Sequence, residues 1–171
     1  MRPNSRLGRC WHYGCIALLL LPLACSPDRP VEAPTRIAAE AFAPLQADVA
    51  AQLQAAYADW LRNHAEQTQA AAQFEAALKF GRLALAFEQY GWASSALAWA
   101  CALAPEDYRC WYLLARSEQA QARFESAMSA LRKALARQPD YLPIRLHLAE
   151  ALLEQGAASE ADAVLRAAGS E

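Results

Sequence analysis

Residues 111–139 read WYLLARSEQAQARFESAMSALRKALARQP, and this stretch decides the fold of the chain. Trp111, Leu114 and Ala115 are spaced three and four residues apart, so they share one face of a predicted helix. A polar turn at 119–123 follows, and Pro139 ends a second helix because it has no amide hydrogen to donate. The stretch therefore predicts a helical hairpin with an apolar face that it cannot bury alone. The second helix carries its apolar stripe at Phe124, Ala127, Met128, Leu131, Ala134 and Leu135.

The same pattern recurs once downstream and once upstream, at a period of about 34 residues. In the downstream copy, Gly156 takes the turn position that Ala122 holds in the middle copy. Three hairpins are therefore predicted, and stacking against one another would cover their apolar faces. The forward shift gives Leu148, Ala149, Ala161, Leu165 and Ala168, and the backward shift gives Phe80, Gly81, Ala93, Leu97 and Ala100.

The upstream copy admits two registers. The register without a gap puts Gly91 inside the second helix, where glycine costs about 1 kcal/mol relative to alanine. The other register uses Gly91 as the turn, with Phe80, Leu83, Ala84 and Phe87 on the first helix. We favour the second register, because glycine is common at helix ends.

Residues 73–171 resemble a tetratricopeptide repeat array, whose pattern is W-x2-L-G-x2-Y, A-x3-F and P within each repeat. The three copies are approximately 74–107, 108–141 and 142–171, and Arg145 stands where the middle copy has Trp111. The resemblance implies an all-α fold, a right-handed α-solenoid of about three helix hairpins. It also implies a groove that binds a protein or peptide partner, and no catalysis.

In this family the groove is lined mainly by the first helix of each repeat, on the side that does not pack within the hairpin. Arg109, Arg116 and Tyr112 together would suit an acidic or aromatic peptide segment. The alternative is that these charges form an ordinary solvated face. The full set of candidate groove residues is Arg82, Arg109, Tyr112, Arg116, Gln119, Leu146, Glu150 and Leu153.

Residues 1–24 have the composition of a secretory signal peptide, with three arginines, no acid, and an apolar run too short to span a bilayer. The segment 21–25, Leu-Pro-Leu-Ala-Cys, resembles a bacterial lipobox, which implies lipidation at Cys25, although Pro22 departs from that pattern. We expect a protein anchored in a membrane of the cell envelope and facing the periplasm. Ser26 resembles the signal for sorting to the outer rather than the inner membrane. A secreted or soluble periplasmic protein is the alternative.

Between the signal and the repeats, residues 25–44 contain several prolines and predict a disordered tether. Residues 45–72 predict one or two amphipathic helices, the first over about 46–63 and the second from about residue 65. Tyr57 and Trp60 lie on the apolar face of the first helix. We expect them to cover the open end of the repeat stack, although an aromatic contact for a partner is the alternative.

The charge of the chain bears on the class of its partner, and its cysteines bear on whether it holds a disulfide. Without residues 1–24 the chain has 13 basic and 18 acidic residues, and it has no basic stripe with interleaved aromatics, so we expect no nucleic-acid partner. Cys101 and Cys110 flank a loop in the repeats. We favour two small buried thiols. The alternative is a disulfide between them, which an oxidising compartment would allow if their Cα atoms lie within about 7 Å.

No local motif predicts catalysis. His64 and His147 have no metal-ligand or nucleophile pattern around them, so we expect no catalytic residue, metal or cofactor. The sequence therefore favours a non-catalytic scaffold or adapter that assists assembly of a protein complex. The alternatives are an accessory subunit or regulator of a cell-envelope enzyme, acting on the wall or in cytochrome maturation, and an enzyme in its own right. No further helix is predicted after Val164 and Leu165 to cover them. We therefore expect self-association through the last repeat.

Overall fold

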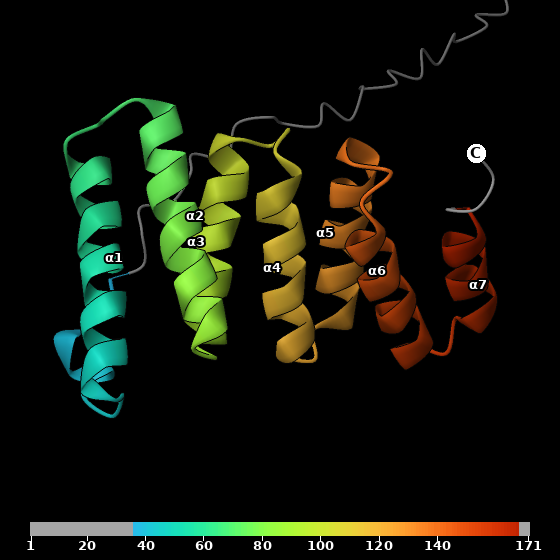
Figure 1. Cartoon of the computed structure of the whole chain (residues 1–171), viewed down its shortest axis with the longest axis horizontal. Coiled ribbons are helices and arrows are strands. Elements are labelled where there is room, and N and C mark those ends of the chain that lie inside the picture. The colour runs from blue at the N-terminus through green and yellow to red at the C-terminus, as the bar shows by residue number, and fades with distance from the viewer. Residues whose placement is uncertain (1–35, 168–171) are drawn as a thin grey trace, which may run out of the picture. The chain divides into compact units, whose positions relative to one another are not determined.

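The computed structural model describes residues 36–167 of the 171-residue chain. This range is helical and holds no strand, which confirms the predicted all-α fold (Figure 1). The predicted signal peptide, Cys25 and the last four residues lie outside the described range. The elements in chain order are a 3-10 helix at Ala39–Phe42 and the α-helices α1 (Ala47–Ala65), α2 (Ala70–Ala86), α3 (Tyr90–Leu103), α4 (Tyr108–Ala120), α5 (Phe124–Arg137), α6 (Leu142–Glu154) and α7 (Ala158–Arg166).

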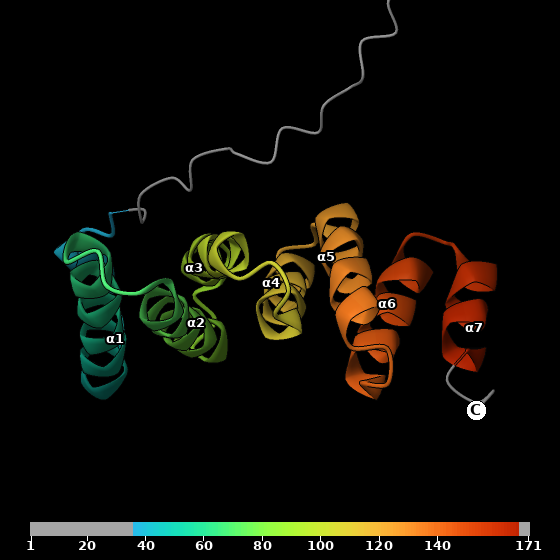
Figure 2. The ribbon, with the colours of Figure 1, turned by 90° about the horizontal axis from the view of Figure 1, so that it is seen from above.

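The six helices from α2 onward form three hairpins, as the repeat pattern predicts. Helix α2 pairs with α3, α4 with α5, and α6 with α7, and each hairpin packs on the next through α3 against α4 and α5 against α6. The first helices of the hairpins also contact one another, α2 with α4 and α4 with α6. Figure 2 shows α2 and α4 on one side of the stack and α3 and α5 on the other.

The turns within the hairpins recur at equivalent positions of the three repeats. Glu88, Ala122 and Gly156 all have positive φ, at 58°, 57° and 74°. After each of them a backbone N–H bonds back to a carbonyl five residues earlier, for example from Gln89 to Ala84 at 2.8 Å, which is the bond of a Schellman cap. The favoured register of the first repeat was therefore wrong. The turn falls at Glu88, and Gly91 lies inside the first turn of α3, as the register without a gap requires.

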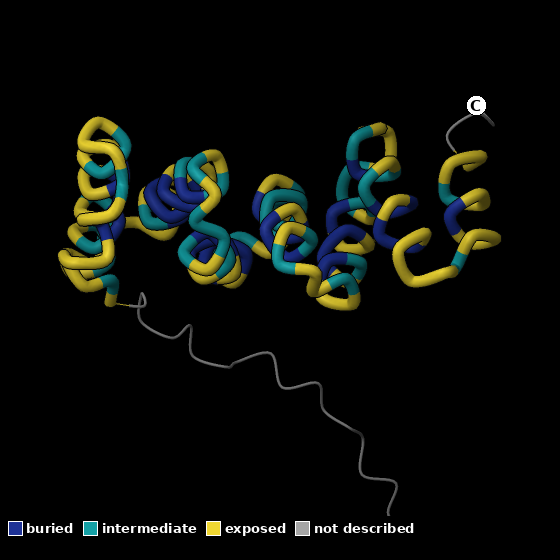
Figure 3. Tube along the Cα trace, turned by 90° about the horizontal axis from the view of Figure 1, so that it is seen from below, coloured by how far each residue is buried: buried dark blue, intermediate teal, exposed yellow. Residues whose placement is uncertain are grey.

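Helix α1 covers the apolar face of the first hairpin. The Trp60 side chain is 1% exposed, and its ring stacks on Phe80 at 5.6 Å and meets Trp99 edge-on at 5.8 Å. Tyr57 is also buried and contacts Phe80 at 5.3 Å. Figure 3 shows buried segments where neighbouring helices face each other. The prediction that Tyr57 and Trp60 cover the end of the stack is confirmed, and neither is free to contact a partner.

The predicted tether ends earlier than residue 44. Residues Ala39–Phe42 form a 3-10 helix, and Phe42 is buried between Tyr57 and Trp92, with ring centroids 6.2 and 4.8 Å away. The Ile37 amide also donates to the Tyr57 hydroxyl at 2.8 Å. The prediction of a disordered tether was therefore wrong for residues 37–44, because the buried Phe42 docks this short segment on the helices. The proline-rich part of the predicted tether, 25–35, lies outside the described residues.

The loop after α1 also differs from the prediction. Helix α1 continues to Ala65, and the chain reverses at Gln67, which has a φ of 49°. Thr68 stabilises this loop, because its amide and its hydroxyl each donate to the Asn63 carbonyl at 3.2 Å. Helix α2 therefore begins at Ala70 and not near residue 65, so one α-helix precedes the three hairpins.

A second apolar cluster fills the space among α4, α5, α6 and α7. The largest buried side chains of this cluster are at most 2% exposed, and they are Leu131, Ile144, Leu148 and Leu152. Leu165, which corresponds to Leu131 one repeat later, is 39% exposed, as the sequence predicts for the last hairpin. Self-association through this hairpin stays a prediction.

A polar network joins the first two hairpins where α4 ends. Glu118 is 8% exposed and accepts two hydrogen bonds from the Arg123 guanidinium, at 2.6 and 2.7 Å. These bonds lower the pKa of the Glu118 carboxyl below its usual value. The Ser94 hydroxyl on α3 lies 2.8 Å from the buried Ser117 hydroxyl and accepts from Gln121 at 2.9 Å. The network fixes α3 against the end of α4.

Two glycines give opposite predictions for the same substitution. At Gly81, an added Cβ would lie 2.6 Å from Cγ of the buried Leu97, whereas at Gly91 it would meet nothing within 4 Å. We expect Gly81→Ala to lower the free energy of unfolding by about 1–3 kcal/mol, because the core is overpacked. Gly91→Ala should raise it by about 0.5–1 kcal/mol, because alanine favours the helix. Urea unfolding of both variants would measure this, and the same sign for both would contradict the packing of α2 on α3.

Candidate functional site

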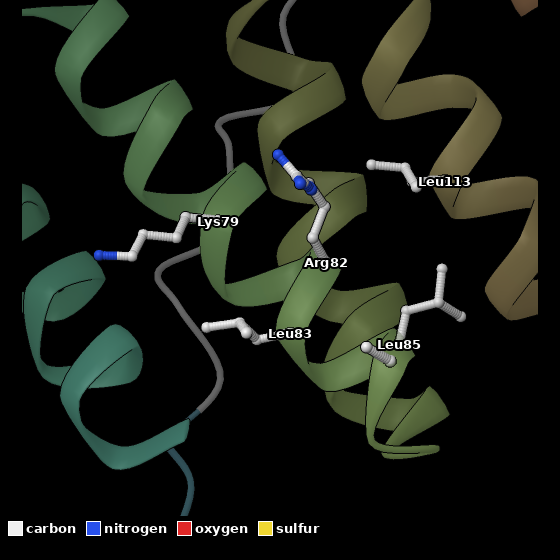
Figure 4. Close-up of a pocket in the computed structure, with 6 residues that line it drawn as sticks. Lys79, Arg82, Leu83, Leu85 and Leu113 are labelled. Atoms are coloured by element: carbon white, nitrogen blue, oxygen red, sulfur yellow. The ribbon is translucent and has the colours of Figure 1, made fainter. Parts of the chain in front are cut away.

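Two hollows lie on the face where α2 approaches α4. The larger has a volume of about 450 Å³, and the smaller has about 200 Å³. They share Arg82 and Leu113, so they are parts of one groove, which we call the α2–α4 groove. Figure 4 shows Arg82 of α2 and Leu113 of α4 on the two sides of the larger hollow. The larger hollow is lined by Lys79, Arg82, Leu83, Leu85, Ala86 and Leu113, and the smaller by Leu78, Arg82, Tyr108, Arg109, Tyr112, Leu113 and Tyr141.

Arg109 lies in the groove, but its charge is compensated. Its guanidinium bonds to Glu75 at 2.8 Å and to Asp107 at 2.8 Å, and it lies 5.4 Å from the centre of the Phe74 ring. Asp107 also caps α4 by accepting from the Arg109 amide at 2.9 Å. The hydrogen bonds raise the pKa of Arg109 and lower the pKa of Asp107. Arg109 therefore positions the start of α4 and offers little free charge.

Aromatic rings gather at the end of the groove that faces α6. Tyr141 lies 5.6 Å from Tyr108 and 5.7 Å from Tyr112, and Tyr112 lies 5.7 Å from His147. We call Tyr108, Tyr112, Tyr141 and His147 the aromatic cluster. The three tyrosines of the cluster all line the smaller hollow.

The other predicted groove residues are spread along α4 and α6. Arg116 is exposed on α4 and lines neither hollow. Gln119 donates to the His147 carbonyl at 3.1 Å, and Glu150 lies 3.0 Å from the His147 ring, so both are engaged within the fold. Leu146 and Leu153 extend the apolar surface beyond the aromatic cluster, at 50% and 57% exposed.

Sequence reasoning placed only Tyr112 of the aromatic cluster in the groove and missed its other three members, Tyr108, Tyr141 and His147. Tyr108 is the first residue of α4, at the repeat position that holds Phe74 in α2 and Leu142 in α6. The repeat shift that found the hairpins could also have found this position, because it carries a large apolar residue in each copy. Tyr141 lies just before α6, outside the repeated stripes, so only the fold reveals its contact.

The described residues lack two structural features, a metal-ligand cluster and a membrane-spanning helix. Residues 36–167 contain no group of three or more His, Cys, Asp and Glu side chains placed to hold a metal ion. The helices in this range are also too short or too polar for any of them to cross a lipid bilayer.

The two repeat cysteines are free thiols in this structure. Cys101 and Cys110 are both buried, and Cys110 donates to the Asp107 carbonyl at 3.1 Å. Burial raises the pKa of Cys101, and contact with Cys110 raises it further. In this structure both side chains are buried thiols that belong to the core, which is the arrangement that the sequence favours. The disulfide stays the alternative.

Comparison with known proteins agrees with the repeat pattern. Residues 118–171 match the sequence profile of the tetratricopeptide repeat family. This part of the chain consists of tetratricopeptide repeats. The match begins at the end of α4, so it includes only Tyr141 of the residues that line the α2–α4 groove. The other lining residues come from α2 in the first copy and from the first half of α4 in the middle copy. Comparison with curated proteins gives no match.

Solved tetratricopeptide structures share the fold. MamA from Desulfovibrio magneticus RS-1, from residue 41 to its end, superposes with a TM-score of 0.60 at 21% identity, covering 76% of this chain and 71% of that one. MamA of MSR-1 gives 0.55 at 16% identity, covering 77% and 83%. MamA of AMB-1 gives 0.52 at 16% identity, covering 77% and 79%. At such identities the likeness concerns the fold alone, and it confirms the predicted solenoid of helix hairpins.

Proposed function

We propose that this protein is a non-catalytic scaffold that binds a partner protein through the face formed by α2, α4 and α6. The observation that carries the proposal is the α2–α4 groove, which opens directly onto the aromatic cluster. Tyrosine supplies a large contact area at a low cost in conformational entropy, together with a hydroxyl that can bond to a peptide backbone. A hollow beside such rings is suited to holding part of a peptide chain.

The exposed leucines of α6 support the same assignment. Five large apolar side chains in the described range are exposed, and Tyr141, Leu142, Leu146 and Leu153 are four of them. They lie on α6 or immediately before it, next to the aromatic cluster. Exposed apolar side chains gathered on one element are typical of interaction sites.

Site-specific photo-cross-linking in cells tests this proposal. A benzophenone amino acid would replace Tyr112 in the groove, and in a matched variant it would replace Ser95, which is exposed on α3. We expect a discrete cross-linked product of higher mass at Tyr112 and none at Ser95. Equal products at both positions, or a product at Ser95 alone, would contradict binding through the groove.

We further propose that the scaffold is held in the cell envelope by lipid attached to Cys25. Support for this comes from the sequence, in which a short apolar run follows three arginines and ends in the lipobox-like segment 21–25. The anchor would hold the groove close to a membrane of the envelope, on the periplasmic side. A scaffold tethered in this way would assist assembly of a complex in that compartment.

A further inference from the structure

We infer that the face of α2, α4 and α6, which includes the α2–α4 groove, takes a peptide of two parts, with acidic residues at one end and large apolar side chains at the other. This inference rests on the proposed function and adds the chemistry of the partner segment. It follows from the way that charge and apolar surface change from repeat to repeat along the face of α2, α4 and α6.

The first two repeats present uncompensated basic side chains. Arg82 on α2 and Arg116 on α4 lie one repeat period apart, so they hold the same repeat position on helices that contact each other. Both are exposed, and neither forms an ion pair with any residue of the described range, in contrast to Arg109 with its two carboxylates. Lys79 is also exposed and unpaired there, and it lines the larger hollow with Arg82.

The third repeat is different at the same positions. Glu150 takes the position of Arg82 and Arg116, and it lies beside His147. Apolar residues become exposed instead, because Leu142, Leu146 and Leu153 of α6 correspond to Tyr108, Tyr112 and Gln119 of α4. The face is therefore basic over α2 and the adjoining part of α4, and it becomes aromatic and then aliphatic toward α6.

Charge complementarity selects the occupant of the basic end. Without its predicted signal peptide, the chain has five more acidic than basic residues, so a face with three uncompensated cations stands out against an acidic protein. Carboxylates of a partner would be attracted to Arg82 and Arg116. They would not have to displace a carboxylate of this protein, because neither arginine forms an ion pair within the described residues.

The spacing of the helices sets the length of the segment. Helices that pack side by side lie about 8–10 Å apart, so the path from α2 across α4 to α6 is roughly 20 Å. An extended chain rises about 3.3 Å per residue, and about six residues therefore separate the acidic part from the apolar part. Binding along this path would use both ends at once.

Fluorescence anisotropy with the full-length protein in detergent tests this inference. The probes are labelled 12-residue peptides that place four Glu at one end and Leu, Phe and Leu at the other, in both orders. A scrambled peptide of the same composition is the reference. We expect one of the two ordered probes to bind at least tenfold more tightly than the scrambled peptide, and we expect added salt to weaken this binding.

Two double variants with the same change in charge locate the binding. The double variant Arg82→Glu with Arg116→Glu should bind the ordered acidic probe at least tenfold less tightly. It should instead bind a probe that has four Lys in place of the four Glu. Arg36→Glu with Arg166→Glu, at exposed positions that lie on none of α2, α4 and α6, should change the binding of neither probe. Circular dichroism would check that both variants remain helical.

Three outcomes would overturn the inference. One is equal binding of the scrambled and ordered probes, and another is equal loss in the two double variants. The third concerns lipid and uses Cys25→Ala protein, in which the predicted anchor is absent. If this protein binds phosphatidylglycerol vesicles, loses that binding when Arg82 and Arg116 are also changed to Glu, and binds no peptide, the basic end is a site for lipid. If cross-linking at Tyr112 succeeds while all probes fail, the groove is still a protein site and only the two-part ligand is wrong.

Discussion

Replacing Trp60 by alanine is expected to lower the free energy of unfolding by about 3–5 kcal/mol, the usual cost of deleting a large buried aromatic side chain. Trp60 is 1% exposed and lies between Phe80 of α2 and Trp99 of α3. Its removal opens a cavity where α1 covers the first hairpin. Urea unfolding followed by circular dichroism at 222 nm would measure the change.

A smaller aromatic residue gives the matched control for this prediction. Trp60→Phe keeps a ring against Phe80 and should cost clearly less than the alanine variant. A loss below about 1 kcal/mol for Trp60→Ala would mean that α1 contributes little to the stack, since buried large-to-small changes cost more than that. The packing of Tyr57 against the same ring would then also be in question.

Replacing Cys25 by alanine should transfer the protein from the membrane fraction to the soluble fraction of the cell. Each buried methylene of an acyl chain contributes about 0.8 kcal/mol to membrane binding, so loss of the lipid removes the dominant attachment. Fractionation followed by immunoblotting would measure the distribution. Mass spectrometry of the wild-type N-terminus should show a diacylated or triacylated cysteine.

A second cysteine in the same segment provides the control for the anchor. Cys10→Ala lies in the predicted signal peptide before the lipobox-like segment and should leave the protein in the membrane fraction. A Cys25→Ala protein that stays in the membrane fraction, or a wild-type protein that keeps Met1, would contradict lipidation at Cys25.

The hairpins could be predicted because their packing is local and periodic. Ala127 and Leu131 are fully buried, and so are their counterparts Ala93 and Leu97 one repeat earlier. Burial on a helix hairpin depends on spacing of three and four residues, and that spacing is visible in the sequence. Shifting the sequence by one repeat period therefore located every hairpin.

The turn of the first hairpin and the docking of Phe42 could not be predicted in the same way. A positive φ is most common for glycine, so we predicted the turn at Gly91. In the structure, the hydrogen bonds of the helix caps hold Glu88 and Ala122 at positive φ instead. Phe42 occupies a space formed by α1 and α3 together. Such a space exists only after the helices have packed.

The candidate groove was predicted in part. Arg82, Arg109 and Tyr112 do line one hollow, because the family pattern identifies which side of each first helix faces outward. The ion pairs that compensate Arg109 come from Glu75 and Asp107, and sequence spacing alone does not show which cation a carboxylate will choose. The remaining free charge could be assigned only after these pairs were known.

Hydrogen exchange of the full-length protein tests the central claim most directly, with and without the ordered acidic probe at saturation. Binding through the proposed face should slow exchange in peptides from α2, α4 and α6, with the largest effect around Arg82 and Tyr112. Peptides from α3, α5 and α7 should exchange at unchanged rates. Slower exchange confined to α3, α5 or α7, with α2 and α4 unchanged, would show that this protein binds its partner through a different surface.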